Sequence, residues 1–113
     1  MRNAAPLTAQ AHFRIAADHP ALPGHFPGAP LVPGALLLAE GLQHLETQCG
    51  RAFRCRRIAG AKFLHPVAPE DTVTVSLSLD AAGHASVDFQ VGTVLVALAT
   101  MVFSPPTHEP AHA

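Results

Sequence analysis

The sequence of 113 residues contains no tryptophan and no tyrosine, only two cysteines, one lysine and 13% charged residues. Cys49 and Cys55 are too few for a disulfide framework and lack zinc-ligand spacing, so they predict reduced thiols in a cytoplasmic protein. A formal net charge of −1 argues against a general nucleic-acid binder. No apolar run reaches the roughly 18–20 residues of a membrane span, and the first eight residues lack the apolar stretch of a secretory signal.

Proline and glycine are concentrated in one segment. Five of the 11 prolines and three of the 8 glycines lie in residues 20–34. Proline fixes the backbone angle φ, and glycine permits close approach of the backbone. We therefore predict a stiff loop in which His25 is either a structural histidine hydrogen-bonded within the loop or an imidazole held rigidly at the mouth of a cavity, with Phe26 as an apolar wall beside it.

Hydrophobic patterning predicts a single domain over residues 8–103, between a loose lead at 1–7 and a disordered Pro/His tail at 104–113. Residues 35–48 contain no proline and many helix formers, and Gly50 would end that helix. The predicted strands cover residues 8–16, 53–64, 72–79, 85–91 and 93–103. The expected fold class is α+β, with a mostly antiparallel sheet wrapped around one central helix. Because the core of such a domain is limited, we expect it to dimerise through an edge strand or through the helix.

The predicted helix has an apolar side and a polar side. At about 100° per residue, the apolar side carries Ala35, Leu38, Ala39, Leu42 and Leu45. The polar side carries Glu40, Gln43, His44 and Thr47. We expect the sheet to cover the apolar side.

The run Gly24-His25-Phe26-Pro27-Gly28, with Pro30 and Pro33-Gly34 after it, resembles the signature of the bacterial 3-hydroxyacyl-[acyl-carrier-protein] dehydratases of the FabZ and FabA type. The resemblance extends through Gln43 and recurs at residues 62–71, so that it covers roughly residues 18–103. It implies a hotdog fold that dimerises and removes water from a 3-hydroxyacyl thioester in fatty acid, polyene or polyketide biosynthesis. The acyl group would be carried on the phosphopantetheine arm of an acyl carrier protein, or as a CoA thioester, with no metal and no other cofactor.

The resemblance also implies roles for individual residues. His25 would be the catalytic imidazole, because a pKa near neutral lets it take a proton from one carbon and return it. Gly34 would donate its N–H to the thioester carbonyl at the start of the helix, where free N–H groups favour developing negative charge. Phe26, Pro33 and Gln43 would contact the substrate.

One position departs from the family's pattern. The family places Glu or Asp fourteen positions after the histidine, usually on the helix of the partner subunit, and here that position is Ala39. Glu40 is adjacent but turned by about 100°, and Glu46 lies about 10 Å further along the helix axis. Three alternatives follow. Glu40 acts as the acid after a π-bulge or a register change; or the chain is a half-catalytic or non-catalytic subunit that pairs with a different hotdog chain and binds acyl carrier protein; or it is an acyl thioesterase in which Glu40 activates water.

Four of the seven cationic residues lie within seven positions, at Arg51, Arg54, Arg56 and Arg57. This cluster is typical of a solvated strand edge and also of a docking surface for an acidic carrier protein. We assign carrier docking to Arg54, Arg56 and Arg57. The histidines outside the loop and the tail have no partners at ligand spacing, so no metal site is predicted.

Overall fold

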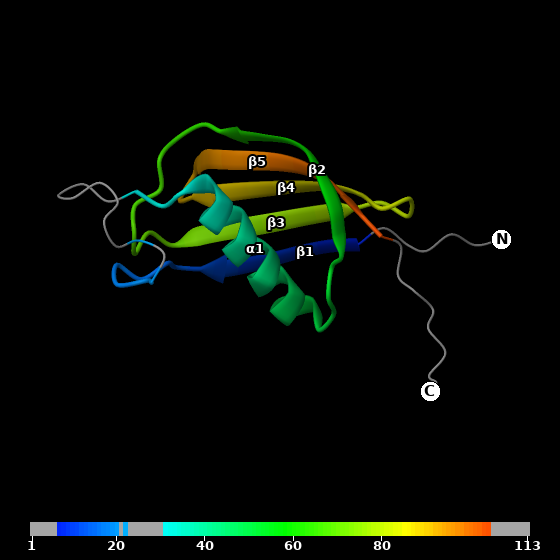
Figure 1. Ribbon diagram of the computed structural model, residues 1–113, viewed down its shortest axis with the longest axis horizontal. Helices are drawn as coiled ribbons and strands as arrows, with labels where there is room; N and C mark the ends of the chain where they lie inside the picture. The colour runs from blue at the N-terminus through cyan, green and yellow to red at the C-terminus, as the bar shows by residue number, and fades with distance from the viewer. Residues whose placement is uncertain (1–6, 21, 23–30, 105–113) are drawn as a thin grey trace.

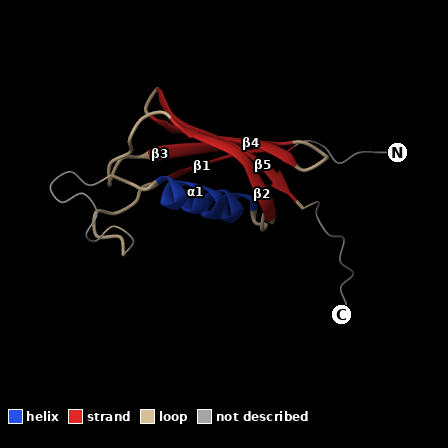
Figure 2. Cartoon of the chain, turned by 45° about the horizontal axis from the view of Figure 1, so that its top comes forward, coloured by secondary structure: helices blue, strands red, loops and turns tan. Residues whose placement is uncertain are grey.

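The computed structural model describes residues 7–20, Leu22 and residues 31–104, which form one helix against a five-stranded antiparallel sheet. Figure 1 shows the elements, and Figure 2 shows the helix as a second layer on one face of the sheet. The strands lie in the order β1-β3-β4-β5-β2. The elements are β1 (Leu7–Phe13), α1 (Gly34–Cys49), β2 (Cys55–Phe63), β3 (Val73–Leu79), β4 (His84–Val91) and β5 (Val94–Phe103). The predicted α+β class and the order of its elements are confirmed.

The core is formed by the face of the sheet that carries the apolar half of each alternating strand. Every second residue of β3 from Val73 to Leu79 is buried, as the strict alternation of that segment predicts. Val75 pairs with Phe89 on β4, and both side chains are fully buried. Asp80 closes the turn between β3 and β4, and the hydrogen bond that it accepts from the N–H of His84 lowers its pKa.

β1 ends at Phe13, three residues earlier than predicted. The backbone after it leaves the sheet because its hydrogen bonds go elsewhere: the carbonyl of Ile15 accepts from the N–H of Glu70 at 2.8 Å. Glu70 has a φ of 74°, in the left-handed region. For a residue with a side chain, this conformation costs roughly 1 kcal/mol. The hydrogen bond to Ile15 is therefore made by a residue whose own backbone is strained.

α1 is rotated relative to the prediction. Its buried residues are Leu37, Gly41 and Leu45, whereas Ala35 and Ala39 are exposed, so their placement on the covered side is wrong. The physical reason is that alanine gains little from burial, while Gly41 lets the helix axis approach the ring of Phe89. Glu40 and His44, placed by prediction on the solvent side, are only half-exposed.

The close approach at Gly41 yields a prediction about stability. A Cβ at this position would lie 2.8 Å from Cζ of Phe89, whose ring is fully buried. We expect Gly41→Ala to lower the free energy of unfolding by about 1–3 kcal/mol through overpacking, although alanine is the better helix former. Urea denaturation measures the change. Gly60→Ala is the control, because a Cβ there meets nothing within 4 Å; equal stability of the two variants would contradict the prediction.

The two ends of α1 fit its sequence. Pro33 is the N-cap residue with extended backbone angles, and the N–H of Leu37 bonds to its carbonyl at 3.0 Å. Gly50 ends the helix in the left-handed conformation, with its N–H on the carbonyl of Glu46, as predicted. All 16 residues between are α-helical, so α1 contains no π-bulge.

β2 is an unpaired edge of the sheet. It pairs with β5 on one side, and no strand of the described chain pairs with its other side. All nine of its residues are exposed, including Ile58 and Phe63 at 49% and 52%. Figure 1 shows β2 running from the C-terminal end of α1 to the edge of the sheet beyond β5. A fully exposed edge of this length that includes large apolar side chains is typical of a surface that pairs with another chain.

Candidate active site

Gly34 lies at the first turn of α1 and lines a small pocket. The N–H groups at the start of a helix have no partner within the helix, and no acceptor for the N–H of Gly34 is present among the described residues. The pocket has a volume of about 170 Å³. It is lined by Val32, Gly34, Leu37, Phe63, Leu64, His65, Pro66 and Val67. A donor at a positive helix end in an apolar pocket is suited to bind a carbonyl oxygen that gains negative charge.

Three backbone hydrogen bonds fix the walls of this pocket. The N–H of Val32 bonds to the carbonyl of Val67 at 2.8 Å, and both side chains are buried. The N–H groups of Leu64 and His65 bond to the carbonyl of Val96 at 2.8 and 3.2 Å. The segment before α1 and the segment after β2 are therefore held together, and Pro33-Gly34 are positioned between them.

Phe63 packs on Gly34, a contact that the sequence did not indicate. A Cβ on Gly34 would lie 2.7 Å from Cζ and 2.8 Å from Cε1 of the Phe63 ring. The two residues are far apart along the chain and no motif links them, so only the fold brings them together. The ring of Phe63 therefore lies against Gly34, and any side chain at this position would displace the ring.

This contact predicts a rescue. If the thioester dehydration expected from the sequence takes place at Gly34, Gly34→Ala should lower its kcat/KM roughly tenfold, because the added methyl group shifts the ring and the donor. Phe63→Ala in the same chain should restore most of that loss, since it removes the clashing ring. Both single variants and the double variant are compared by steady-state kinetics. A double variant as slow as Gly34→Ala, with wild-type circular dichroism, would show that the clash is irrelevant.

Glu40 lies away from the pocket, between two histidines. Its Oε2 is 3.7 Å from Nε2 of His19, and its Oε1 is 3.5 Å from Nε2 of His44. The Glu40 side chain is 22% exposed. The ring of His44 stacks on Phe13 of β1 at 5.0 Å. The Glu40 carboxylate therefore lies on the side of α1 that faces β1, whereas Ala39 and Gln43 lie on the exposed side of the helix.

The remaining predicted site residues are distributed as follows. His25 and Phe26 lie outside the described residues. Pro33 adjoins Gly34 and is half-buried, and Gln43 is exposed on α1. Arg54, Arg56 and Arg57 are all exposed, and none of them has an ion-pair partner in the described part of the chain. Arg51 instead lies over the ring of Phe53 at 5.3 Å.

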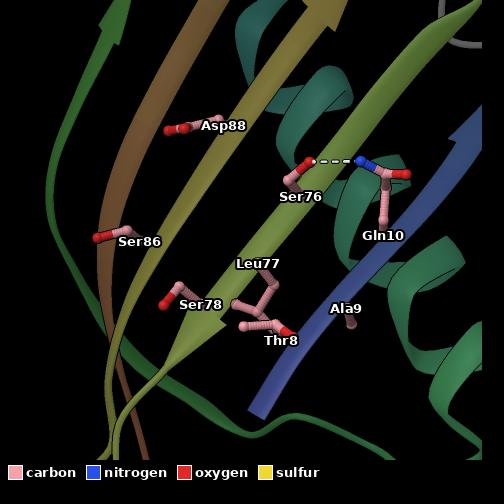
Figure 3. A pocket seen from close by; sticks show the side chains of 8 residues that line it. All are labelled: Thr8, Ala9, Gln10, Ser76, Leu77, Ser78, Ser86 and Asp88. Atoms are coloured by element: carbon pink, nitrogen blue, oxygen red, sulfur yellow. Dashed lines mark hydrogen bonds between the residues drawn. The ribbon is translucent and has the colours of Figure 1, made fainter. Parts of the chain in front are cut away.

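A second hollow lies on the face of the sheet that α1 does not cover. Its volume is about 480 Å³. Figure 3 shows hydroxyl and amide groups from β1, β3 and β4 around it, with Gln10 donating to Ser76 at 3.2 Å. It is lined by Thr8, Ala9, Gln10, Ser76, Leu77, Ser78, Ser86 and Asp88. None of its hydroxyl groups is paired with a histidine base, so nothing here competes with the pocket at Gly34.

Within the described ranges, no three histidine, cysteine, aspartate or glutamate side chains are arranged to hold a metal ion. None of the helices there is long and apolar enough to cross a membrane. Both cysteines are free.

The fold places the chain among hotdog proteins. It matches an uncharacterised protein from Erwinia carotovora subsp. atroseptica with a TM-score of 0.73 and 19% identity, over 93% of this chain and 89% of that one. It matches the dehydratase heterocomplex ApeI:P from Xenorhabdus doucetiae with a TM-score of 0.73 and 16% identity, over 91% and 98%. An acyl-CoA hydrolase from Staphylococcus aureus matches with a TM-score of 0.65 and 15% identity, over 89% and 65%. These likenesses confirm the predicted hotdog fold.

The sequence narrows this class to a family. The family model of the ApeI-like dehydratases matches residues 2–100, so the chain belongs to the ApeI-like family. The FabZ dehydratase of Desulforamulus reducens is 29% identical over 101 residues, which are 80% of this chain and 71% of that protein. The FabZ protein of Mannheimia succiniciproducens is 31% identical over 98 residues, 73% of this chain and 65% of that protein. Against the FabZ proteins of Chloroflexus aggregans and Haemophilus influenzae, the chain spans about half of their length.

Proposed function

We propose that this chain is a subunit of a dehydratase that acts on 3-hydroxyacyl thioesters. The observation that carries the proposal is the N–H of Gly34 at the start of α1, which has no acceptor among the described residues and belongs to a residue lining a mostly apolar pocket. Such a donor stabilises charge on a thioester oxygen. Membership in the ApeI-like dehydratase family supports the same reaction.

Three groups carry out the proposed reaction: a base, a hydrogen-bond donor and an acid. His25 takes the proton from C2, and the electron pair of that bond forms the double bond to C3. The N–H of Gly34 binds the thioester carbonyl while negative charge develops on it. The C3–O bond breaks, and an acid donates a proton so that the oxygen leaves as water. The product is the trans-2-enoyl thioester.

The scheme also requires an acid, and this chain offers no carboxyl group at the position where the family has one. Glu40 as the acid stays a prediction, and in this role the carboxylate would have to leave His19 and His44, because α1 has no bulge that turns it. Ala39, at the family's acid position, is exposed and has no carboxyl group. We therefore propose that a second hotdog chain supplies the acid across a dimer interface. The similar ApeI:P structure, which is a dehydratase heterocomplex, supports a mixed pair.

The charges on β2 favour a different chain over a second copy. Residues 47–69 contain no aspartate or glutamate, whereas β2 carries Arg56, Arg57 and Lys62. If two copies paired antiparallel about the strand's midpoint, Ala59, then Arg56 of each would lie opposite Lys62 of the other. Like charges directly opposite each other destabilise a strand pair. A partner strand without cations avoids this repulsion and leaves the arginines available to an acidic carrier protein.

This arrangement predicts a salt effect on self-association. We expect the isolated chain to dimerise weakly in about 0.05 M salt and roughly tenfold more tightly in about 1 M salt, where charges are screened beyond about 3 Å. Arg56→Glu should self-associate tightly in low salt, because it turns both like-charge pairs into opposite-charge pairs. Sedimentation equilibrium measures the dissociation constants. Arg14→Glu, an exposed change beyond the end of β1, is the matched control. A tight dimer that ignores salt would contradict the prediction.

The proposed activity is tested with a 3-hydroxyacyl group on pantetheine and on an acyl carrier protein. Mass spectrometry should detect a product lighter by one water, and the carrier-bound form should have the lower KM if Arg54, Arg56 and Arg57 dock the carrier. The assay is run on the chain alone and on the chain purified with any hotdog protein encoded beside it. Release of free thiol without an enoyl product would identify a thioesterase instead. Binding of acyl carrier protein without turnover in either preparation would identify a non-catalytic subunit.

A further inference from the structure

The short segment between β1 and residue 23 leads directly into the loop that carries His25. We call its described residues, 15–20 and Leu22, the loop stem. The stem has its own hydrogen bonds: the N–H of His19 bonds to the carbonyl of Ala16, and the N–H of Leu22 to that of His19, both at 3.0 Å. Leu22 is buried in the core. The stem is therefore an ordered start for the loop, three residues before His25.

One side of the stem is held by Glu70. The N–H of Glu70 bonds to the carbonyl of Ile15, and its Oε2 accepts from the N–H of Ala17 at 3.1 Å. Because Glu70 has a positive φ, this double contact offsets a backbone strain that a glycine there would not have. The first residues of the stem are thus tied to the turn before β3.

The other side of the stem faces α1, where Glu40 is within ion-pair distance of His19 and His44. His44 is itself fixed, because its ring stacks on Phe13 with an angle of 9° between the ring planes. Glu40 consequently lies between a fixed ring on the helix and a ring on the stem. Its exposure of 22% and that of His19, 26%, place the contact partly out of water, where electrostatic attraction is less screened.

We propose that Glu40 is a positioning residue that anchors the loop stem to α1 through His19, with His44 as its support. The anchor fixes the stem up to Leu22, three positions before His25 in the sequence, and through the stem we expect Glu40 to affect the proposed reaction. The anchor itself is independent of the reaction, whereas its bearing on catalysis rests on the proposed function.

Hydrogen exchange of the stem tests the anchor without any assay of turnover. In Glu40→Ala, we expect the amides of His19 and Leu22 to exchange at least tenfold faster, because their hydrogen bonds depend on a stem held in place. The amides of β3 and β4 serve as an internal reference for global stability. Gln48→Ala, an exposed change on the same helix, should exchange like the wild type. If Glu40→Ala also loosens the reference strands, His19→Ala, which removes the other partner of the same contact, is measured in its place with the amide of Leu22 as reporter.

A double-mutant cycle identifies His19 as the residue through which Glu40 acts. Glu40→Ala should add no further exchange to a chain that already carries His19→Ala. Unchanged exchange in Glu40→Ala, or effects that simply add, would overturn the proposal.

Where dehydration is measurable, kinetics separate positioning from acid catalysis. A positioning role predicts that Glu40→Ala lowers kcat and leaves KM unchanged, and that Glu40→Gln recovers most of the loss. Loss of activity in Glu40→Gln as deep as in Glu40→Ala would instead assign the acid to Glu40 and overturn the proposal. A wild-type protein without dehydratase activity would refute the proposed function, and the exchange experiment would still decide the anchor.

Discussion

Replacement of His25 by alanine is expected to abolish dehydration, with a fall in kcat of about 10²–10⁴-fold. The reason is that no other group is assigned to take the C2 proton. Substrate binding should change little, because the pocket at Gly34 is lined by other residues, most of them apolar. The measurement is the rate of enoyl formation from a 3-hydroxyacyl pantetheine thioester, with KM determined separately.

His84→Ala is the control for this experiment. His84 is at the turn between β3 and β4, with its side chain 65% exposed, and takes no part in the proposed site. It should keep wild-type activity. If His25→Ala retained a tenth or more of the activity, the C2 proton would be removed by a different group, and the assignment based on the Gly-His-Phe-Pro-Gly motif would be refuted.

Ala39→Glu is expected to raise the dehydratase activity of the chain assayed without a partner chain. The substitution restores a carboxyl group at the position where the family has its acid. In a pair of identical copies, each chain would then offer both an imidazole and an acid, and the gain should be about 10²-fold. The assay is run in about 1 M salt, where screening lets two cationic β2 edges approach.

Ala35→Glu is the matched control for this gain. Ala35 is exposed on the same side of α1, one turn earlier. A glutamate there adds the same charge away from the position where the family has its acid. It should remain at wild-type activity. If Ala39→Glu formed a dimer by sedimentation but gained nothing over Ala35→Glu, a missing acid would not be what limits this chain.

The sequence predicted the strands well because their pattern is simple. On β3, alternation of apolar and polar residues places Val73 and Val75 in the core with no need of tertiary information. The rotation of α1 was predicted less well. Ala39 counts as apolar and Gly41 as neutral on any hydrophobicity scale, yet the structure buries Gly41 and exposes Ala39. The fit of α1 against the ring of Phe89 decides which helix residue is buried at this point. A pattern of apolar and polar residues does not encode that fit.

The candidate site likewise contains a residue that the sequence predicted and contacts that it did not. The motif led to Gly34 because backbone donors at a helix start follow from local sequence. It gave no sign of Phe63, which reaches Gly34 only after β2 has paired with β5. The partners of Glu40 were also beyond prediction, since His19 comes from a loop whose path is set by Glu70, a residue distant in the chain. Contacts between distant segments depend on the whole fold.

The unpaired edge of β2 affects whether the protein stays dispersed in the cell. An unpaired strand that is exposed along its whole length is a template on which further chains can stack, and such edges seed aggregation. Arg56, Arg57 and Lys62 act against this, because cations on an edge repel a second identical strand. The same residues would therefore keep newly made chains apart until the partner proposed above is synthesised. We expect the yield of dispersed protein to depend on co-production of that partner.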